Sequence, residues 1–516
     1  MFASYSRFLR SFRDAKKIVS STSFYRQETT VASEKSECNI KSFDSIPGPR
    51  RLPLIGHLHL FSKFGPYSFD KLYDAYEDLY KLYGPIVRLD VGISLVLLFR
   101  PEDIQQVLAL DGRYPQRPIF EALRFYRSKK KDTYSSAGLV GENGHEWRRL
   151  REAINFMMRP HFAQLYLPAQ TEIAQDFVNR IKLVKDADGH IPDFLQEIYR
   201  FTEEAIGFVC FGTRLGLLNQ ALTDNSAQLS KAADDTMQAL ADTLLGFPWW
   251  KIFNTPTYKK LAQSQDFFHN FASKCAKEAA ERIKHHNSDD VSLEFFKRLF
   301  TENKLNSKDV SLLMTEIFSA GIDATGNAIG FLLYDLAQNP EVQQKLFEEI
   351  ERYAPCGQEK MQDTVENMKY LNACIKESYR LHPTSGGTAR ILNEETVLSG
   401  YYIPKNTLCV GPHPIISRLP EHFTDPLKFK PERWVDEHSR RIGNVAHPYC
   451  VLPFTHGVRR CVGQRFAEQE IRLCIIKVIQ NFEVTYNGPE VGRKMRMLLI
   501  PDKPLNFTFT DRLRIK

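Results

Sequence analysis

The sequence lacks the short motifs that mark several large enzyme classes. Its 516 residues contain no His-Glu-x-x-His pattern, no Walker A loop and no Gly-x-Gly-x-x-Gly fingerprint, which argues against a zinc protease, a P-loop enzyme and a built-in dinucleotide domain. The nine cysteines are odd in number and include no Cys-x-x-Cys pair, so they predict neither a disulfide framework nor a zinc site. A reducing compartment fits this cysteine usage.

Long hydrophobic runs are also missing. The longest apolar stretch, residues 91–99, is about nine residues and predicts a strand, because a membrane span needs about twenty. Any membrane contact is therefore expected to be peripheral. The best candidate is the aromatic segment 244–250, followed by Lys251, since aromatic rings beside a cation suit a membrane interface. Burial of this segment in the core is the alternative.

The positive charge is concentrated near the N-terminus. Six Lys or Arg and two Asp or Glu lie in residues 1–33, so only three of the seven net positive charges lie beyond them, which is too few to suggest nucleic-acid binding. On a helix, Tyr5, Phe8 and Phe12 share one face, with arginines opposite. This pattern is typical of a mitochondrial transit peptide. We expect a transit peptide and leader at residues 1–40; a disordered basic tail is the alternative.

The rest of the chain predicts one large, mostly helical α+β domain, residues 41–516, with a small β region. No linker or repeat divides it. Strand signals occur at 86–90 and 95–99, and helical patterns dominate from 148 to 480. The clearest helix is 307–338, which at 1.5 Å per residue would span about 48 Å and cross the core.

The strongest chemical signal is a segment of ten residues near the C-terminus. Phe454, Gly457, Arg459, Cys461 and Gly463 match F-x-x-G-x-R-x-C-x-G, and on this motif the chain resembles the cytochrome P450 family beyond about residue 45. The resemblance implies the P450 fold and a haem b cofactor, with Phe454 beside it and Cys461 as the thiolate ligand of the iron. A thiolate favours O–O cleavage, and the helix expected after Cys461 favours the thiolate form.

A second pair of motifs carries meaning only through this resemblance. Glu377 and Arg380 form an E-x-x-R, a spacing that surface pairs also show, and Arg433 follows in a Pro-x-Arg. In P450s these positions form a buried network that braces the cysteine loop. The resemblance therefore implies a structural role for all three.

Four further residues are expected to contact the haem. Trp147 and Arg151 lie one helical turn apart, as in P450s that bind a haem propionate in this way, although surface pairing is the alternative. The family supplies other propionate donors at the positions of Arg390 and Arg459.

The middle of the long helix resembles the oxygen-activation segment of the family. Asp323 is the acid that connects to a proton path, and small residues such as Gly321 leave room over the iron. The threonine that normally orients water is replaced by Ala324. Thr325 is rotated from it by roughly 100°, so either the helix is locally unwound, or water and substrate replace the missing hydroxyl. Asp323 and Thr325 are the catalytic candidates; an apolar core helix is the alternative.

The leader and residues 114–118 resemble the mitochondrial branch of the family, which receives electrons from a small acidic ferredoxin. Lys376 matches a basic position of the ferredoxin patch, whereas the position one turn earlier is Asn372. Arg460 and Arg465 add positive charge beside the cysteine. The resemblance implies a peripheral protein on the matrix side of the inner mitochondrial membrane. A solvated basic face without a partner is the alternative.

Within this branch, segments 390–393, 398–401 and 448–454 resemble the ecdysteroid 22-hydroxylases of arthropods, the disembodied type. This implies a haem-thiolate monooxygenase that uses O2 and ferredoxin electrons to hydroxylate a steroid, an ecdysteroid precursor, at side-chain C22. The alternatives are a xenobiotic substrate, another steroid position, a non-redox haem-binding protein or a P450-type isomerase. Asp323 and Lys376 argue against the last two, since neither needs proton delivery or a ferredoxin.

Overall fold

The structure is a computed structural model that describes residues 40–62, 64–221, 224–244, 247–285, 290–301, 304–355, 367–435 and 447–512. The transit peptide expected at the N-terminus lies outside these residues, apart from Ile40. Lys41–Lys516 form one compact unit, whose elements are described below.

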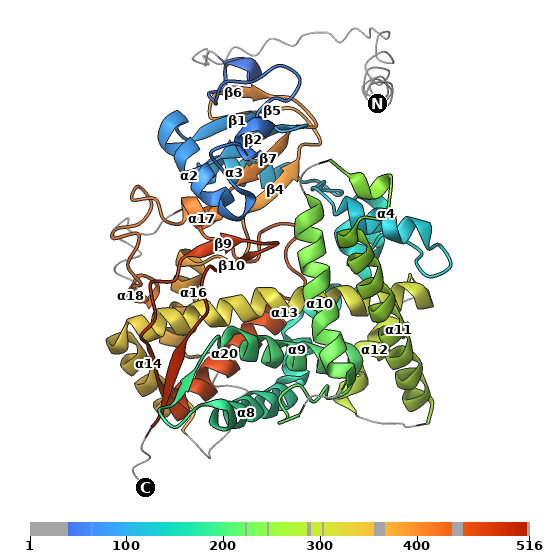
Figure 1. Ribbon diagram of the computed structural model, residues 1–516, viewed down its shortest axis with the longest axis vertical. Helices are drawn as coiled ribbons and strands as arrows, with labels where there is room; N and C mark the ends of the chain where they lie inside the picture. Colours follow the sequence, from blue (N-terminus) through green and yellow to red (C-terminus); the bar gives the residue numbers. More distant parts are fainter. Residues whose placement is uncertain are drawn as a thin grey trace, which may run out of the picture. The chain divides into compact units, whose positions relative to one another are not determined.

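The unit is mostly helical with small sheets, as the sequence predicts (Figure 1). The helices that carry the argument are α3 (Pro101–Ala109), α4 (Glu121–Lys129), α5 (Gly138–Gly141), α6 (Gly144–Ala153), α8 (Leu167–Val184), α9 (Leu195–Phe211), α10 (Asp224–Leu244), α11 (Pro256–His285), α13 (Ser307–Gln338), α16 (Lys369–Leu381), α18 (Glu432–Val435) and α20 (Gln464–Asn481). The others are α2 (Leu72–Tyr83), α7 (Pro160–Leu165), α12 (Glu294–Thr301), α14 (Pro340–Tyr353) and α17 (His413–Ile416).

In the part of the chain that the structure describes, the strands form four small sheets. The largest has the order β1 (Ile86–Asp90), β2 (Ser94–Leu98), β7 (Leu408–Gly411) and β4 (Thr388–Ile391), with β2 and β7 parallel. The expected strands at 86–90 and 95–99 are therefore confirmed, the second shifted by one residue. The other sheets pair β5 (Thr396–Leu398) with β6 (Tyr401–Ile403), β9 (Arg493–Met495) with β10 (Leu499–Pro501), and β11 (Phe507–Asp511) with β3 (His190–Ile191) and β8 (Phe482–Tyr486).

Helix α13 runs through the unit over the predicted residues (Figure 1). It begins at a capping box in which the Asn306 side chain accepts from the Asp309 backbone N–H and the Asp309 carboxylate accepts from the Asn306 N–H. Nearly every residue of α13 is buried, because α9, α11, α16 and α20 pack around it. A helix that is apolar on all sides requires such surroundings.

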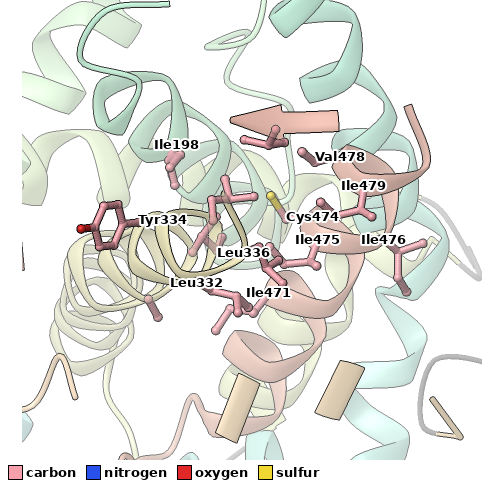
Figure 2. Packing of buried hydrophobic residues seen from close by; sticks show 14 of the residues in the cluster. Ile198, Leu332, Tyr334, Leu336, Ile471, Cys474, Ile475, Ile476, Val478 and Ile479 are labelled. Atoms are coloured by element: carbon pink, nitrogen blue, oxygen red, sulfur yellow. The ribbon is translucent and has the colours of Figure 1, made fainter. Parts of the chain in front are cut away.

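The core between α9, α13 and α20 fixes the helix that follows the cysteine motif. Figure 2 shows Ile198 of α9 and Leu332 and Leu336 of α13 packed with one side of α20, which includes Ile471 and Ile475. These residues are at most 1% exposed, and burying an aliphatic side chain contributes about 1.5–3 kcal/mol. This packing fixes α20, which begins three residues beyond Cys461.

Candidate functional site

The cysteine motif forms a tight loop that ends at α20. The Cys461 N–H donates to the Phe454 carbonyl at 3.0 Å, and the Arg460 N–H donates to the Gly457 carbonyl at 3.1 Å. Thr455 and Gly457 have φ values of 53° and 81°, and the second is a left-handed conformation that glycine adopts without strain. Gly463 precedes the first turn of α20, so Cys461 lies beside the N-terminus of that helix, as predicted.

Cys461 is set apart from the other cysteines by its accessibility. It is exposed, whereas all other cysteines among the described residues are buried. The protein packed around it raises the pKa of the thiol, but the Gly463 N–H and the guanidinium groups of Arg151 and Arg117 act in the opposite direction. Donors and cations that favour the thiolate are what a sulfur ligand of a metal requires.

A cluster of four arginines surrounds this sulfur. Arg117, Arg151, Arg390 and Arg459 interact electrostatically with one another, and the first two also with Cys461. Burial lowers the pKa of Arg151 to about 10 and that of Arg459 to about 9. Among the described residues, the carboxylate bonded to this cluster is Asp111, which accepts from Arg390 Nε at 2.7 Å. The cluster therefore carries an excess of buried positive charge, which is costly unless anions balance it.

The hydrogen bonds of the cluster are incomplete as well. Arg459 donates to the Pro115 carbonyl and stacks over the Trp147 ring at 3.9 Å, yet its Nη1 has no partner among the described residues, and neither does Arg390 Nη2. Arg151 meets only the Met158 sulfur, at 2.8 Å, in the described structure. Buried N–H groups without acceptors indicate that further acceptors belong there. Two propionate carboxylates would supply both the acceptors and the negative charge, so these residues fit a haem.

The structure brings together Trp147, Arg151, Arg390 and Arg459, which the motifs single out from distant parts of the sequence. It adds Asp111 and Arg117, which the motif analysis misses. Arg117 lies within the segment 114–118, which the sequence marks only as a feature of the mitochondrial branch. Asp111 has no local signal, because its importance comes from its bond to Arg390, which is remote in the sequence.

The oxygen-activation segment is regular α-helix throughout. No residue of α13 departs from helical structure, so of the two alternatives the local unwinding near Gly321 or Gly326 is not found. Ala320 is exposed and Ala324 partly exposed, and they lie one turn apart on one side of α13, which we call its open face; Gly321 and Asp323 are also partly exposed. Thr325 is only 3% exposed, and an ideal helix rotates it roughly 100° away from Ala324.

The presence of glycine at position 321 has a different explanation from the one expected. A Cβ atom there would lie 2.8 Å from Ile206 of α9, so glycine allows α9 and α13 to approach each other rather than leaving room on the open face. Thr325 is one turn beyond Gly321, on the same side of α13. Asp323 is half-buried, and burial raises the pKa of its carboxyl to about 6.

The E-x-x-R motif forms the buried network that the sequence predicts. The Glu377 carboxylate accepts from Arg380 Nη2 at 2.8 Å, from Arg433 Nε at 2.9 Å and from Trp434 Nε1 at 2.9 Å. Neither Glu377 nor Arg380 is exposed. Tyr379, beside Arg380, packs edge-on against Phe454 with ring centroids 5.6 Å apart, so the network abuts the cysteine loop.

A cavity of about 370 Å³ lies on the surface beside this loop. Lys376 and Arg460, two of the predicted dock residues, line it together with Arg472, which the sequence analysis misses. Arg465 does not line the cavity; it is exposed on α20 and lies 3.8 Å from Glu468. The structure thus brings together two of the three expected basic residues.

The aromatic segment is divided between surface and core. Phe247 and Trp249 are each 53% exposed, with Phe253 beside them, whereas Trp250 is buried against Phe125 and Tyr258. Burial in the core is therefore confirmed for Trp250, whereas membrane contact of the exposed residues stays a prediction. Within the described part of the chain, no helix is long and apolar enough to cross a membrane.

Comparisons with known proteins agree with this geometry. A family model described as Cytochrome P450 matches residues 46–509. The chain is 33% identical over 477 residues, 90% of this chain and 94% of the relative, to "Cytochrome P450 302a1, mitochondrial" of Drosophila melanogaster. It is 30% identical over 504 residues, 95% of this chain and 92% of the relative, to "Ecdysone 20-monooxygenase" of the same species. The solved structure of the cytochrome P450DA heme domain has the same fold, with a TM-score of 0.74 and 20% identity over 91% of this chain and 98% of that one.

Proposed function

The chain belongs to the cytochrome P450 family, and we propose that it is a mitochondrial monooxygenase that hydroxylates an ecdysteroid precursor at side-chain C22. As a P450 it is an oxidoreductase that binds haem through a cysteine thiolate. The observation that carries the proposal is Cys461, the exposed cysteine just before α20, which interacts with Arg151 and Arg117 of a cluster in which Arg390 and Arg459 have nitrogens without acceptors among the described residues.

The residues around Cys461 have distinct tasks in this proposal. Cys461 is the iron ligand, and the Gly463 N–H favours its thiolate form. Arg151, Arg390 and Arg459 bind the propionates, with Trp147 supporting the guanidinium of Arg459 and Phe454 packing beside the loop. Arg117 joins them. When bound, the thiolate-ligated haem supplies the activation of O2.

Proton delivery is assigned to Asp323. Its carboxyl has a pKa of about 6 because it is buried, so it can both hold and release a proton near neutral pH. Thr325 is the weaker candidate, since its side chain is buried and α13 is not unwound to turn it toward Ala324. We therefore propose that water or a substrate hydroxyl takes the place of the side chain missing at Ala324.

Electrons enter, in this proposal, from a mitochondrial ferredoxin that docks beside Lys376 and Arg460. Reversing these charges, as in Lys376→Glu and Arg460→Glu, should slow ferredoxin-supported turnover and flatten its salt dependence, because charge steers the encounter. Arg465→Glu is the matched control and should have the smaller effect, since Arg465 does not line the cavity. Peroxide-driven turnover should stay unchanged; equal loss in both assays would mean damage to the haem site instead.

The proposed mitochondrial location follows from the proposed assignment to the mitochondrial branch of the family. A relative at 33% identity is named mitochondrial, and Phe247 and Trp249 offer an exposed aromatic contact for the matrix face of the inner membrane. Residues 1–40 fused to a reporter should reach mitochondria. Targeting to the endoplasmic reticulum would contradict the assignment to this branch.

The substrate is tested by turnover of a panel with purified protein, adrenodoxin and its reductase. The panel should include ecdysteroid precursors with an unoxidised side chain, cholesterol, and a xenobiotic probe such as 7-ethoxycoumarin. A relative at 30% identity is named for ecdysone oxidation, which supports a steroid substrate. We expect a C22 alcohol from an ecdysteroid precursor. Oxidation at another position, or of the xenobiotic alone, would contradict the substrate assignment.

A further inference from the structure

A buried polar cluster lies where α9, α10, α13 and the turn between β9 and β10 meet. It contains Glu203 of α9, Ser230 and Asp234 of α10, Asp323 of α13, and Arg496 of the turn. Figure 1 shows α10 crossing α13 near the β9–β10 hairpin. The motifs of the sequence identify only Asp323 in this cluster, and the activity described above uses none of the other four.

At its inner end the cluster reaches Asp323 of α13, the helix that has the open face. Asp323 interacts electrostatically with Arg496 and Asp234. Its backbone carbonyl accepts from Asn327 Nδ2 at 2.7 Å, and Asn327 in turn accepts from the Tyr199 hydroxyl of α9 at 3.1 Å. These bonds hold this part of α13 against α9 and so fix the position of Asp323.

The outer end of the cluster reaches solvent through α10. Ser230 is half-buried, and its hydroxyl donates to Glu203 Oε2. Asp234, one turn further along α10, is 67% exposed at its side chain and accepts from Arg496 Nη2 at 2.6 Å. Arg496 Nε is buried and has no partner among the described residues. The polar groups therefore run from the surface to the inside of the protein.

Glu203 lies between these two ends, and its carboxyl group forms no ion pair among the described residues. It is 4% exposed, and the Ser230 hydroxyl is the hydrogen bond that the structure records for its carboxyl group. The pKa of Glu203 is raised to about 7; burial is the largest cause, Asp323 and Asp234 also raise it, and Ser230 and Arg200 lower it. A buried carboxyl that exchanges protons near neutral pH is uncommon among purely structural residues.

We propose that Ser230 and Glu203 are the route by which protons from solvent reach Asp323. The proposal rests on the proton-donor role of Asp323 proposed above. After Asp323 has released its proton toward the open face of α13, the protonated Glu203 passes its own proton to the Asp323 carboxylate. In one concerted step, the Ser230 hydroxyl takes a proton from solvent as it gives its own proton to the Glu203 carboxylate, so no alkoxide forms. The net result is that one proton passes from solvent to Asp323, and no electron is transferred.

The inference makes Glu203 a residue that acts through Asp323 rather than on substrate. Its signature is therefore kinetic. Turnover of the native protein should fall as the pH rises through about 7, because Glu203 then loses the proton that it passes on. A purely structural residue would not produce a pH limb or a solvent isotope effect that follows this carboxyl group.

The test is Glu203→Gln in the haem-loaded enzyme, reduced by adrenodoxin and followed by oxygen consumption and product in H2O and D2O. Glutamine keeps the acceptor for Ser230 but holds no exchangeable acid. We expect turnover about tenfold lower, below the roughly hundredfold that one positioned donor contributes, since water can still reach Asp323 slowly. The solvent isotope effect should grow, and the pH limb near 7 should disappear. Peroxide-driven turnover should persist, because hydrogen peroxide brings its own protons.

The control is Glu204→Gln, the adjacent buried acid on α9. Its carboxylate accepts from Arg214 and from the Leu215 and Leu217 N–H groups and does not join the cluster, so its isotope effect should stay native. Ser230→Ala should act like Glu203→Gln but more weakly, and it tests the route if Glu203→Gln does not retain haem. An unchanged isotope effect in Ser230→Ala and in a haem-loaded Glu203→Gln would overturn the inference.

Asp323→Asn separates this inference from the function on which it rests. If Asp323→Asn slows turnover and raises the isotope effect while Glu203→Gln does neither, the route through Glu203 is wrong and the role of Asp323 stands. If Asp323→Asn also changes neither quantity, the proton-donor role of Asp323 is wrong and the route fails with it.

Discussion

Two groups of buried arginines, the pair bonded to Glu377 and the cluster near Cys461, differ in how completely they are bonded. Arg380 donates to both oxygens of Glu377 and to the carbonyls of Ser417 and Pro426. No nitrogen of Arg380 or Arg433 is without a partner. In the cluster around Cys461, by contrast, Arg390 Nη2 and Arg459 Nη1 have no acceptor among the described residues.

This difference distinguishes arginines that stabilise the fold from arginines that bind a ligand. A buried cation whose donors are all satisfied by its own chain has no use for a further ligand. A group of cations with one bonded carboxylate and unused donors is poorly solvated unless an anion joins it. Charge balance therefore favours a structural role for the Glu377 network and supports the proposed haem-binding role of the arginine cluster, although both consist of the same residue type.

The largest effect expected from this comparison is that of Glu377→Gln. The substitution leaves two guanidinium groups buried without their carboxylate, which costs about 3–5 kcal/mol of unfolding free energy. Urea titration should show helix and haem lost together at a much lower urea concentration. Glu77→Gln, which breaks the exposed pair with Lys81, is the control and should leave the midpoint nearly unchanged. A stable Glu377→Gln protein would contradict the bracing role.

Arg151→Leu should separate haem binding from folding. The described contact of this guanidinium is a sulfur, so the fold loses little or is even stabilised, while the haem loses a charge-assisted hydrogen bond worth about 1.5–3 kcal/mol. Transfer of haem to apomyoglobin should become roughly tenfold to hundredfold faster. In urea, haem should be lost before helix, the reverse of the joint loss in Glu377→Gln. Simultaneous loss would show that Arg151 is structural.

The sequence predicts those parts of the site that lie in short, continuous motifs. The bounds of α13 and the cysteine loop are local patterns, and the structure confirms them. The Glu377 network is implied by the family resemblance, and the structure shows its hydrogen bonds. The sequence does not identify Asp111 and Arg117, because their significance arises from neighbours that are distant in the sequence. The same holds for Glu203 and Arg496, which look like ordinary surface charges until the fold buries them beside Asp323.

Gly321 shows a subtler limit. Its small size fits an open face above the haem as well as it fits a close helix crossing, and only the position of Ile206 decides for the crossing. The helical rotation between Ala324 and Thr325 was calculable, but whether the helix unwinds to compensate depends on the packing of α9. Local sequence therefore leaves such choices open.

The smallest expected effect tests whether the open face of α13 extends to Thr325. Thr325→Ala should change the ratio of hydrogen peroxide to product little, because Thr325 is buried away from the open face. Ala324→Thr should lower that ratio for a substrate that lacks a hydroxyl near the oxidised carbon. If Thr325 were the proton donor, its loss would instead raise the barrier by about 3 kcal/mol, the roughly hundredfold effect of one proton donor. A sharp rise in Thr325→Ala would return proton delivery to Thr325.

The most direct test of the account is the carbon monoxide difference spectrum of the reduced protein, with and without Cys461. The native protein should show the red-shifted Soret band of a thiolate-ligated haem. Cys461→Ser should abolish that band with little loss of helical circular dichroism, whereas Arg151→Leu should retain it. An unchanged band in Cys461→Ser would contradict the assignment of the iron ligand, and with it the reading of the arginine cluster as the haem site.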